Sequence, residues 1–431
     1  MTKILLISSN SLSKTDSTKS YEAILSSFKK EELAQLCFRP RSSSSIDFDF
    51  ISSHFLISEV DIIKSFFTNR KCGRSIIEKD SSPSKKSKSA SWYYWVSESK
   101  FRRLFIIRYL LWSSNRWDNE KLNSWIKSFN PDVIFTIAGA EEFYCKITKT
   151  ISNRYNIPYV VYYTDDYVLN YRPSGIWGKY LRNKRHKYFA DFINGASLRY
   201  CIGTKMAQDY SRCFNKAFIP IMNCVNVLPF VPNNNNNKKC IISYFGSLHL
   251  HRWLMISKFS DVINENCEIH VYTGSDLTNE MKNSLNKDNI VLKGKVSAND
   301  INSEMYRSDF LLHIESDEPY FSNLTHYSIS TKIPEYLMSG RPIICYAPID
   351  LASVQLIKDN NLGLVLNPND DASYNRDVLV KFVNDKGKYD DLSKRGYQFA
   401  ISNFDRQQIS LSFRNRIEDI SNGKSKISSY Y

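Results

Sequence analysis

The 431-residue chain lacks the cysteine and hydrophobic patterns that mark several common classes of protein. Its nine cysteines are scattered, odd in number and without a C-x-x-C pair, which argues against zinc and thioredoxin-like chemistry and is typical of a reducing compartment. No run approaches the ~20 apolar residues that a spanning helix needs. The apolar start at 4–7 is too short for a signal peptide. We therefore expect a cytoplasmic protein.

Acidic residues are outnumbered, with 44 Asp and Glu against 58 Lys and Arg, which gives a formal net charge of +14. This excess suits an anionic partner such as a nucleotide, a phosphate or an acidic membrane surface. Zinc-finger spacing, an RNP-like aromatic motif and a basic zipper region are all missing, so nucleic acid is not expected. The seven histidines show no metal-ligand spacing, and we expect no metal and no cofactor.

Short apolar runs alternate with helical patterns along the chain, which predicts parallel strands joined by helical crossovers. In the first half the expected strands are 4–7, 133–137, 159–163 and 198–202, with helices near 20–28 and 206–214. After five asparagines at 233–237 the pattern restarts, with strands expected at 241–245, 268–272, 290–292, 310–314, 342–346 and 363–366. The sequence thus predicts two α/β units of Rossmann-like build.

The run 330–344 carries the clearest local signals. Ser330 or Thr331 can cap a short helix, Gly340 can end it, and an apolar strand follows. Lys332 and Glu335 are three residues apart and share one face of that helix. Backbone N–H groups at a helix start favour phosphate, and a carboxylate one turn deeper can accept from two ribose hydroxyls. Taken alone, the pair is equally a simple intrahelical ion pair worth ~0.3 kcal/mol.

This run resembles the donor-binding segment of GT-B glycosyltransferases of the family 4 type, where a Lys and a Glu precede a small residue, a Gly and a strand-leading Pro. The similarity extends to 241–252 and 294–312 and, in the first half, to 131–166 and 198–226. It implies the GT-B fold, two Rossmann-like domains facing across a cleft. It also implies transfer of a sugar from a nucleoside-diphosphate donor with retention of configuration and without a catalytic metal.

By this resemblance, Glu335 holds the ribose, while Lys332 and Arg252 bind the donor phosphates and stabilise the charge that develops on them in the transition state. Val296 and its neighbours meet the base. The implied donor site comprises Gly246, Ser247, Arg252, Val296, Ser330, Thr331, Lys332 and Glu335. His249 and His251 lie beside Arg252 and are expected to line the same site.

The chain departs from the family pattern at two places. The glutamate usually found eight residues before Glu335 is replaced by Tyr327, although Glu315, Asp317 and Glu318 lie in a nearby loop that can face the sugar. The usual glycine-rich first loop is replaced by 9–13, Ser-Asn-Ser-Leu-Ser, which offers hydroxyls and an amide. The donor sugar therefore stays open.

Polar residues that follow the early strands are the candidates for an acceptor site, because the carboxyl ends of strands face the crevice in such sheets. They are Asn10, Ser11, Glu141, Asp165 and Asp166. Glu142 is an alternative to Glu141, and helix capping is an alternative role for the aspartates. A D-x-D triplet is absent, so a metal role is not favoured.

The expected domains are an acceptor-side unit at 1–232, a linker at 233–239, a donor-binding unit at 240–388 and a terminal helical segment at 389–431. In this fold the terminal helix commonly packs back on the first domain. The basic, aromatic stretch 85–116 is either an ordinary amphipathic helix or a surface for anionic lipid headgroups at the inner membrane face.

The expected function is transfer of a sugar to a saccharide or lipid-linked acceptor during bacterial surface polysaccharide synthesis. One alternative is a GT-B-shaped protein that binds nucleotide-sugars without turnover. Another is an inverting transferase or an epimerase, which would need a positioned carboxylate or histidine base.

Overall fold

The computed structural model describes residues 1–12, 19–39, 46–68, 71–76, 102–139, 141–170, 175–235 and 237–423. The chain divides into two compact units. The N-terminal unit comprises 1–201, 207–220 and the last helix from Ser410 on, and the C-terminal unit comprises 202–206 and 221–409. Most of the stretch 85–116 lies outside the described residues. No helix in the described part of the chain is long and apolar enough to cross a membrane.

The N-terminal unit is built on an eight-stranded sheet with the order β4-β3-β2-β1-β5-β6-β7-β8, in which only the β3–β4 pair is antiparallel. Its strands are β1 Ile4–Asn10, β2 Leu33–Arg39, β3 Ser53–Leu56, β4 Arg74–Ile76, β5 Val133–Ile137, β6 Tyr159–Tyr163, β7 Leu198–Cys201 and β8 Ile219–Pro220. The helices of this unit are α1 Lys19–Leu25, α2 Glu59–Phe67, α4 Arg102–Ser113, α5 Glu120–Phe129, α6 Phe143–Tyr155, α7 Gly175–Gly195 and α8 Thr204–Phe214.

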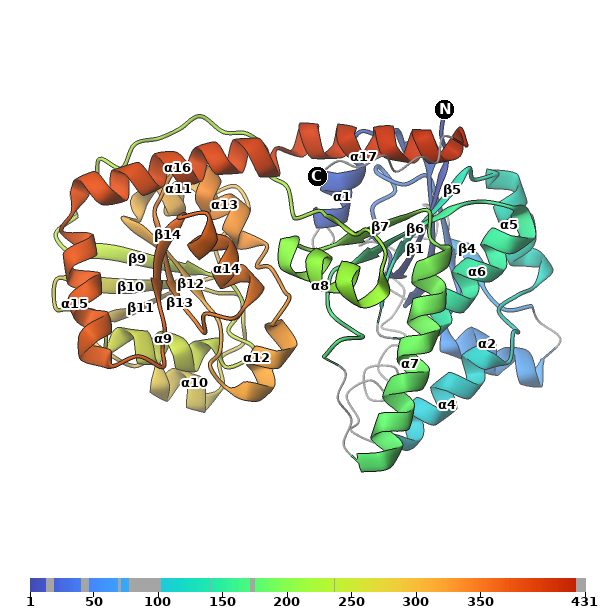
Figure 1. Ribbon diagram of the computed structural model, residues 1–431, viewed down its shortest axis with the longest axis horizontal. Coiled ribbons are helices and arrows are strands. Elements are labelled where there is room, and N and C mark those ends of the chain that lie inside the picture. The colour runs from blue at the N-terminus through green and yellow to red at the C-terminus, as the bar shows by residue number, and fades with distance from the viewer. Residues whose placement is uncertain are drawn as a thin grey trace. The chain divides into compact units, whose positions relative to one another are not determined.

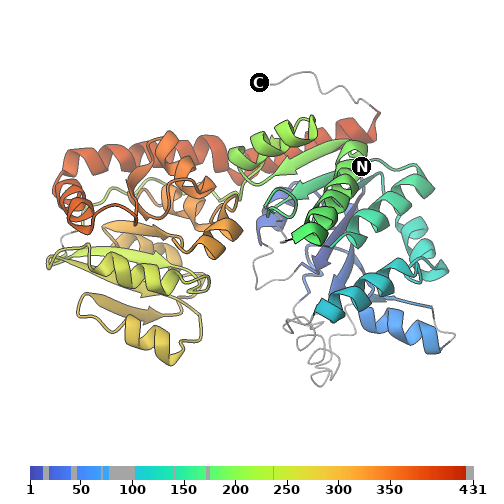
Figure 2. The ribbon, with the colours of Figure 1, turned by 60° about the horizontal axis from the view of Figure 1, so that its bottom comes forward.

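Helices cover both faces of this sheet (Figure 2). Successive residues of a strand point to opposite faces. Phe135 of β5 packs on Phe413 of α17 Arg406–Ser421, while the neighbouring Thr136 is hydrogen-bonded to Thr148 of α6. On the α17 face, the Arg414 guanidinium also binds the buried Glu32 carboxylate at 2.9 Å. The last helix from Ser410 on is therefore part of the N-terminal core.

The C-terminal unit has a six-stranded, all-parallel sheet with the order β11-β10-β9-β12-β13-β14. Its strands are β9 Cys240–Phe245, β10 Cys267–Tyr272, β11 Ile290–Gly294, β12 Phe310–Ile314, β13 Ile343–Tyr346 and β14 Gly363–Leu366. Its helices are α9 Arg252–Ser260, α10 Asn279–Ser284, α11 Ile301–Arg307, α12 Pro319–Thr325, α13 Lys332–Met338, α14 Ala352–Asp359, α15 Ala372–Val383 and α16 Lys386–Phe404. In Figure 1, α9 and α10 lie on one face of this sheet and α13 and α14 on the other.

The asparagine run that we expected as a linker is bound to the C-terminal unit. The Asn233 amide donates to the Asp309 carbonyl, and the Asn235 amide donates to the carbonyls of Tyr306 and Ser308. The carbonyls of Tyr306 and Ser308 lie at the end of α11, where a helix leaves carbonyls without intrahelical partners. The boundary between the units accordingly falls earlier, after Pro220.

Candidate functional site

The strand order fixes where a ligand site is expected in each unit. In both sheets the order reverses beside the first strand, between β1 and β5 in one unit and between β9 and β12 in the other. Doubly wound sheets bind ligands outside the carboxyl ends of the strands at this point. We therefore compare the candidate residues from the sequence with the loops that follow these strands and with the side chains beside those loops.

Lys332 and Glu335 lie on the first turn of α13, as their spacing predicts. The Lys332 ammonium is 2.9 Å from a Glu335 carboxylate oxygen, and the two side chains are 29% and 38% exposed. The backbone N–H of Lys332 donates to the Ser330 hydroxyl at 3.3 Å, whereas Thr331 makes no side-chain cap. Because both charged groups reach solvent and their pairing is weak, an incoming ligand can separate them at small cost.

Tyr336 fixes α13 to the carboxyl end of β9. Its hydroxyl accepts from the backbone N–H of Phe245 at 3.0 Å and donates to the Phe245 carbonyl at 3.3 Å. The ring is 1% exposed, and burial raises the pKa of the phenol. Since Glu335 directly precedes Tyr336, this anchor sets the position of the carboxylate beside the loop that begins at Gly246.

Arg252, at the start of α9, is bound to a carboxylate of the same unit. Its guanidinium makes three contacts of 2.9–3.1 Å with the carboxylate of Glu315, the residue that directly follows β12. Glu315 is 4% exposed; burial raises its pKa, and the Arg252 charge opposes that rise. Breaking such a pair costs several kcal/mol, so a ligand is expected to meet Arg252 through the part of the guanidinium that Glu315 does not occupy.

The other acids of the 315–318 loop also pair with α9 or the residue before it. The Lys258 ammonium is 2.6 Å from Asp317, and the His251 ring is 3.2 Å from Glu318. The loop therefore ties α9, at both its start and its last turn, to the end of β12. Tyr327 is buried, with the Lys205 ammonium 6.0 Å from its ring centre, so no carboxylate stands at this position.

Gly246 and Ser247 begin the loop after β9. The Ser247 carbonyl accepts from the Tyr244 hydroxyl at 2.6 Å, and a side chain at Gly246 would meet that same hydroxyl at 3.0 Å. Val296 lies just beyond β11, on the same edge of the sheet but two strands away from β9. The structure thus groups Gly246, Ser247 and α13 closely through Tyr336, with Val296 further along the edge.

In the N-terminal unit, the loop after β1 is held by a buried glutamine. The Gln35 amide donates to the Ser8 hydroxyl and to the Asn10 carbonyl, and its oxygen accepts from the Leu12 N–H at 3.1 Å. Ser11 is 1% exposed, and within the described residues its hydroxyl has no hydrogen-bond partner. Hydrogen bonds from the Gln35 side-chain amide therefore hold this loop, which takes the place of the glycine-rich loop expected from the resemblance.

Glu141, just after β5, is held by arginines from two other elements. The Arg108 guanidinium of α4 contacts Glu141 at 2.5 Å and Glu59 at 2.8 Å, and Arg39 at the end of β2 lies 3.6 Å from Glu141. Trp112 also donates to Glu59. In this described part of 85–116, α4 therefore turns Arg108 and Trp112 into the unit.

The two aspartates after β6 differ in role. Asp166 accepts from three successive backbone N–H groups, those of 168–170, and from the Tyr210 hydroxyl at 2.7 Å. It is a loop cap. Asp165 is exposed and accepts from the Tyr167 hydroxyl at 3.3 Å. Of the two aspartates, Asp165 is therefore the more exposed one.

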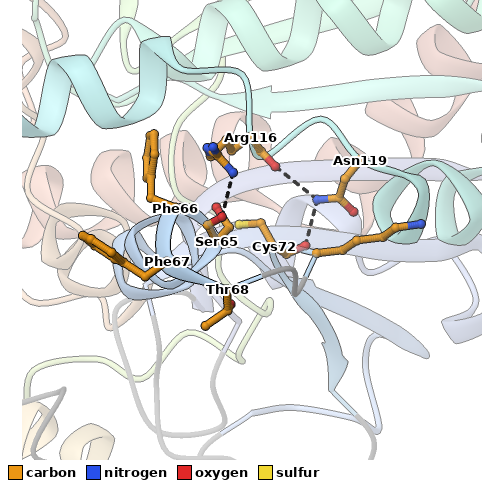
Figure 3. A pocket seen from close by; sticks show the side chains of 8 residues that line it. Ser65, Phe66, Phe67, Thr68, Cys72, Arg116 and Asn119 are labelled. Atoms are coloured by element: carbon orange, nitrogen blue, oxygen red, sulfur yellow. Dashed lines mark hydrogen bonds between the residues drawn. The ribbon is translucent and has the colours of Figure 1, made fainter.

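A hollow of about 650 Å³ lies elsewhere on the N-terminal unit (Figure 3). Arg116 and Asn119 in its wall donate to the carbonyls of Ser65 and Cys72. The hollow is lined by Ser65, Phe66, Phe67, Thr68, Lys71, Cys72, Arg116 and Asn119. None of these residues is a candidate for the donor or acceptor site, and Arg116 and Asn119 are occupied by structural hydrogen bonds.

Several contributors were not foreseen from the sequence. The pairing of Glu315 with Arg252 spans 63 positions, and Tyr336 reaches a strand 91 positions away. For Arg108 there was a signal, a single cation inside an apolar run. Across the described residues, no group of three His, Cys, Asp or Glu is placed to hold a metal ion.

Comparison with known proteins gives one domain match. Residues 242–379 match the family described as "Glucosyltransferase 3-like, C-terminal domain". No curated protein sequence matches the chain. The matched range contains β9 through most of α15, and with them the Arg252–Glu315 pair and the Lys332–Glu335 pair.

Solved structures match over nearly the whole length. HepE of Anabaena, in complex with UDP, has a TM-score of 0.62 at 12% identity, covering 97% of this chain and 100% of its own. Sucrose-phosphate synthase of Thermosynechococcus elongatus has a TM-score of 0.63 at 12% identity, covering 98% and 100%. A TarM variant of S. aureus, in complex with fondaparinux, alpha-GlcNAc-glycerol and UDP, has a TM-score of 0.58 at 11% identity, covering 97% and 99%.

These matches confirm the predicted fold class, which is the GT-B fold with two Rossmann-like units. The domain match and the fold together indicate a glycosyltransferase.

Proposed function

We propose that the chain transfers a sugar from a nucleoside-diphosphate donor to a saccharide or lipid-linked acceptor, with retention of configuration, in the synthesis of a bacterial surface glycan. The observation that carries the proposal is the first turn of α13. There a lysine and a glutamate reach solvent together, 2.9 Å apart, on a helix that Tyr336 fixes beside the loop after β9.

In this proposal Glu335 accepts hydrogen bonds from the ribose hydroxyls, and Lys332 moves from Glu335 to the diphosphate. The N–H groups of Gly246 and Ser247, with Ser330 and Thr331, line the phosphates, and the backbone near Val296 meets the base. Arg252 remains bound to Glu315 and offers its outer edge to the β-phosphate. As the donor bond breaks, negative charge grows on that phosphate, and cations aimed at it stabilise the transition state more than the ground state.

The N-terminal unit supplies the acceptor side, with Asn10, Ser11, Glu141, Asp165 and Asp166 around the carboxyl ends of β1, β5 and β6. We further propose that no metal ion or cofactor takes part. Association with the inner face of the membrane remains a proposal and rests on the basic, aromatic composition of 85–116 and on exposed Tyr109 and Leu110 in α4.

The test is transfer activity, and donor hydrolysis without acceptor, for the wild-type chain and for Glu335→Ala and Lys332→Ala. We expect both variants to lose at least roughly tenfold in transfer, because each removes a charged contact worth about 1.5–3 kcal/mol. Full activity in both variants contradicts the site. A wild-type chain that binds donor but neither transfers nor hydrolyses supports the non-catalytic alternative, and the anomeric configuration of the product decides retention.

A further inference from the structure

Two cysteines lie directly opposite each other on neighbouring strands of the C-terminal sheet. Cys240 is the first residue of β9, Cys267 is the first residue of β10, and the parallel register pairs them. Neighbouring strands lie about 4.7–4.9 Å apart, and the Cα atoms that a disulfide joins lie about 4.4–6.8 Å apart. The backbone of this pair is therefore already within the range that a disulfide requires.

The side chains of the two cysteines also meet. Cys267 belongs to the buried apolar cluster of this unit, and Cys240 packs against the same cluster. The two thiols share a hydrogen bond, and neither cysteine is in a disulfide. A bond between the two sulfur atoms thus needs no change of strand register and no side chain to cross the sheet.

The two thiols hold their protons unequally. The hydrogen bond from Cys240 lowers the pKa of the Cys267 thiol, against the effects of burial and of the Asp309 charge. The same hydrogen bond, together with burial, raises the pKa of the Cys240 thiol. Cys267 is 2% exposed, whereas Cys240 is only partly buried. Oxidants react with thiolates that they can reach, and this pair combines a shared thiolate with one partly exposed side chain.

The other cysteines lack this arrangement. Across the strand pairings of the described residues, no other two cysteines are partners in register. Cys213 of α8 is exposed, and its sulfur lies 3.2 Å from the ring of His186. Cys213 is therefore the control for an exposed thiol that has no second cysteine in register.

We propose that Cys240 and Cys267 form a site of reversible oxidation, at which hydrogen peroxide converts the two thiols into a disulfide. The shared proton moves to Cys267, and the Cys240 thiolate attacks one peroxide oxygen. The O–O bond breaks, Cys240 becomes a sulfenic acid, and the hydroxide that leaves takes up a proton to give water. The Cys267 sulfur then attacks the Cys240 sulfur, the S–O bond breaks, and the oxygen leaves as a second water with the Cys267 proton.

This site lies away from the proposed donor-binding loops. The bond joins the amino ends of β9 and β10, whereas Gly246 and Ser247 follow the carboxyl end of β9. The closed loop 240–267 nevertheless contains both of these residues and Arg252. Oxidation therefore links the two ends of the segment that carries them, and the inference does not depend on the proposed function.

The test is peptide mapping of the full chain after exposure to hydrogen peroxide and alkylation of the remaining thiols. Trypsin places the two cysteines on fragments 240–252 and 259–282, each of which has one cysteine. We expect these fragments to be linked, lighter together by two hydrogen atoms than the reduced pair, and separated again by a dithiol. Because the register holds the sulfur atoms together, linkage should be at least roughly tenfold faster in the folded chain than in urea.

Three variants assign the steps. Cys267→Ser should stop at the Cys240 sulfenic acid, which dimedone traps, and Cys240→Ser should form no linked fragment. Cys213→Ser should form the bond at the wild-type rate. Absence of the linked fragments from the folded wild-type chain, equal rates in the folded and unfolded chain, or an equal loss in Cys213→Ser overturns the proposal. The comparison of folded and unfolded wild-type chain holds whether or not the variants fold.

Discussion

The two units share a reversal of strand order beside their first strands, but the ion pairs at that edge bury different partners. In the C-terminal unit the carboxylate of the Arg252–Glu315 pair is the buried partner, and the cation is the more exposed one, at 21% against 6%. In the N-terminal unit the arginine of the Arg108–Glu141 pair is the less exposed partner, at 19% against 26%. The shared topology therefore fixes where a ligand site is expected in each unit, whereas long-range ion pairs fix which charged side chain of each pair is the more buried.

Removing Arg252 tests this comparison with the largest expected effect. Arg252→Met leaves the Glu315 carboxylate buried and unpaired, which costs about 3–5 kcal/mol of unfolding free energy. Burial alone then raises the pKa of Glu315 further. A carboxyl whose pKa is higher in the folded state stabilises the fold at low pH and loses that contribution as pH rises. The variant should therefore gain stability, relative to wild type, as pH falls from 7.5 to 5.

Urea unfolding of both proteins at the two pH values measures this effect. A loss below about 1 kcal/mol, or the same pH dependence in variant and wild type, shows that Arg252 does not compensate Glu315. The exposed pair Lys386–Asp390 offers the control, since surface pairs contribute about 0–1 kcal/mol.

Acid should destabilise the N-terminal unit through His54 of β3. Burial lowers the pKa of this histidine from 6.5 to about 4. The unfolded chain then binds more protons between these values, so stability is lost as pH falls from about 6.5 through 4, by about 3 kcal/mol. Hydrogen exchange of β1–β3 amides at pH 7 and pH 5 follows the loss. His54→Asn should flatten the pH dependence in these strands, and an unchanged slope in that variant would point to another titrating group.

The smallest effect is expected from the anchor of α13. Tyr336→Phe leaves the buried N–H of Phe245 without its partner, which costs about 1–3 kcal/mol. The donor-binding turn should loosen, and affinity for UDP should fall several-fold. Tyr346→Phe is the control, a buried tyrosine of β13 for which the described residues provide no hydroxyl hydrogen bond. If calorimetry finds the same stability and the same affinity for UDP in both variants, the Tyr336 hydroxyl does not anchor α13.

Strands with mostly apolar runs could be predicted from the sequence, among them β5, β6, β12 and β14 at their observed bounds. The strands β2 and β3 could not, because they carry Gln35 and His54 in the core. These two side chains are fully buried and hydrogen-bonded to each other at 3.1 Å. Buried polar residues that satisfy one another break the apolar pattern without breaking the strand.

The candidate site likewise has contacts that the sequence predicts and contacts that it does not predict. The contact between Lys332 and Glu335 follows from helical spacing and was therefore predictable. The partner of Arg252 was not, because Glu315 comes from a distant segment that only the parallel pairing of β9 and β12 brings near. The pairing of strands that are distant in the sequence decides which charged side chains already have an ion-pair partner. Local sequence patterns do not show these partners.

The most direct test of the central assignment is calorimetric titration of UDP into the wild-type chain, into Glu335→Ala and into Glu280→Ala, which removes an exposed glutamate of the same unit. We predict that Glu335→Ala weakens binding by roughly 10–100-fold, as expected for lost hydrogen bonds to a charged group. The Glu280→Ala variant should bind as the wild type does. Equal affinity of all three proteins would contradict the placement of the nucleotide at α13.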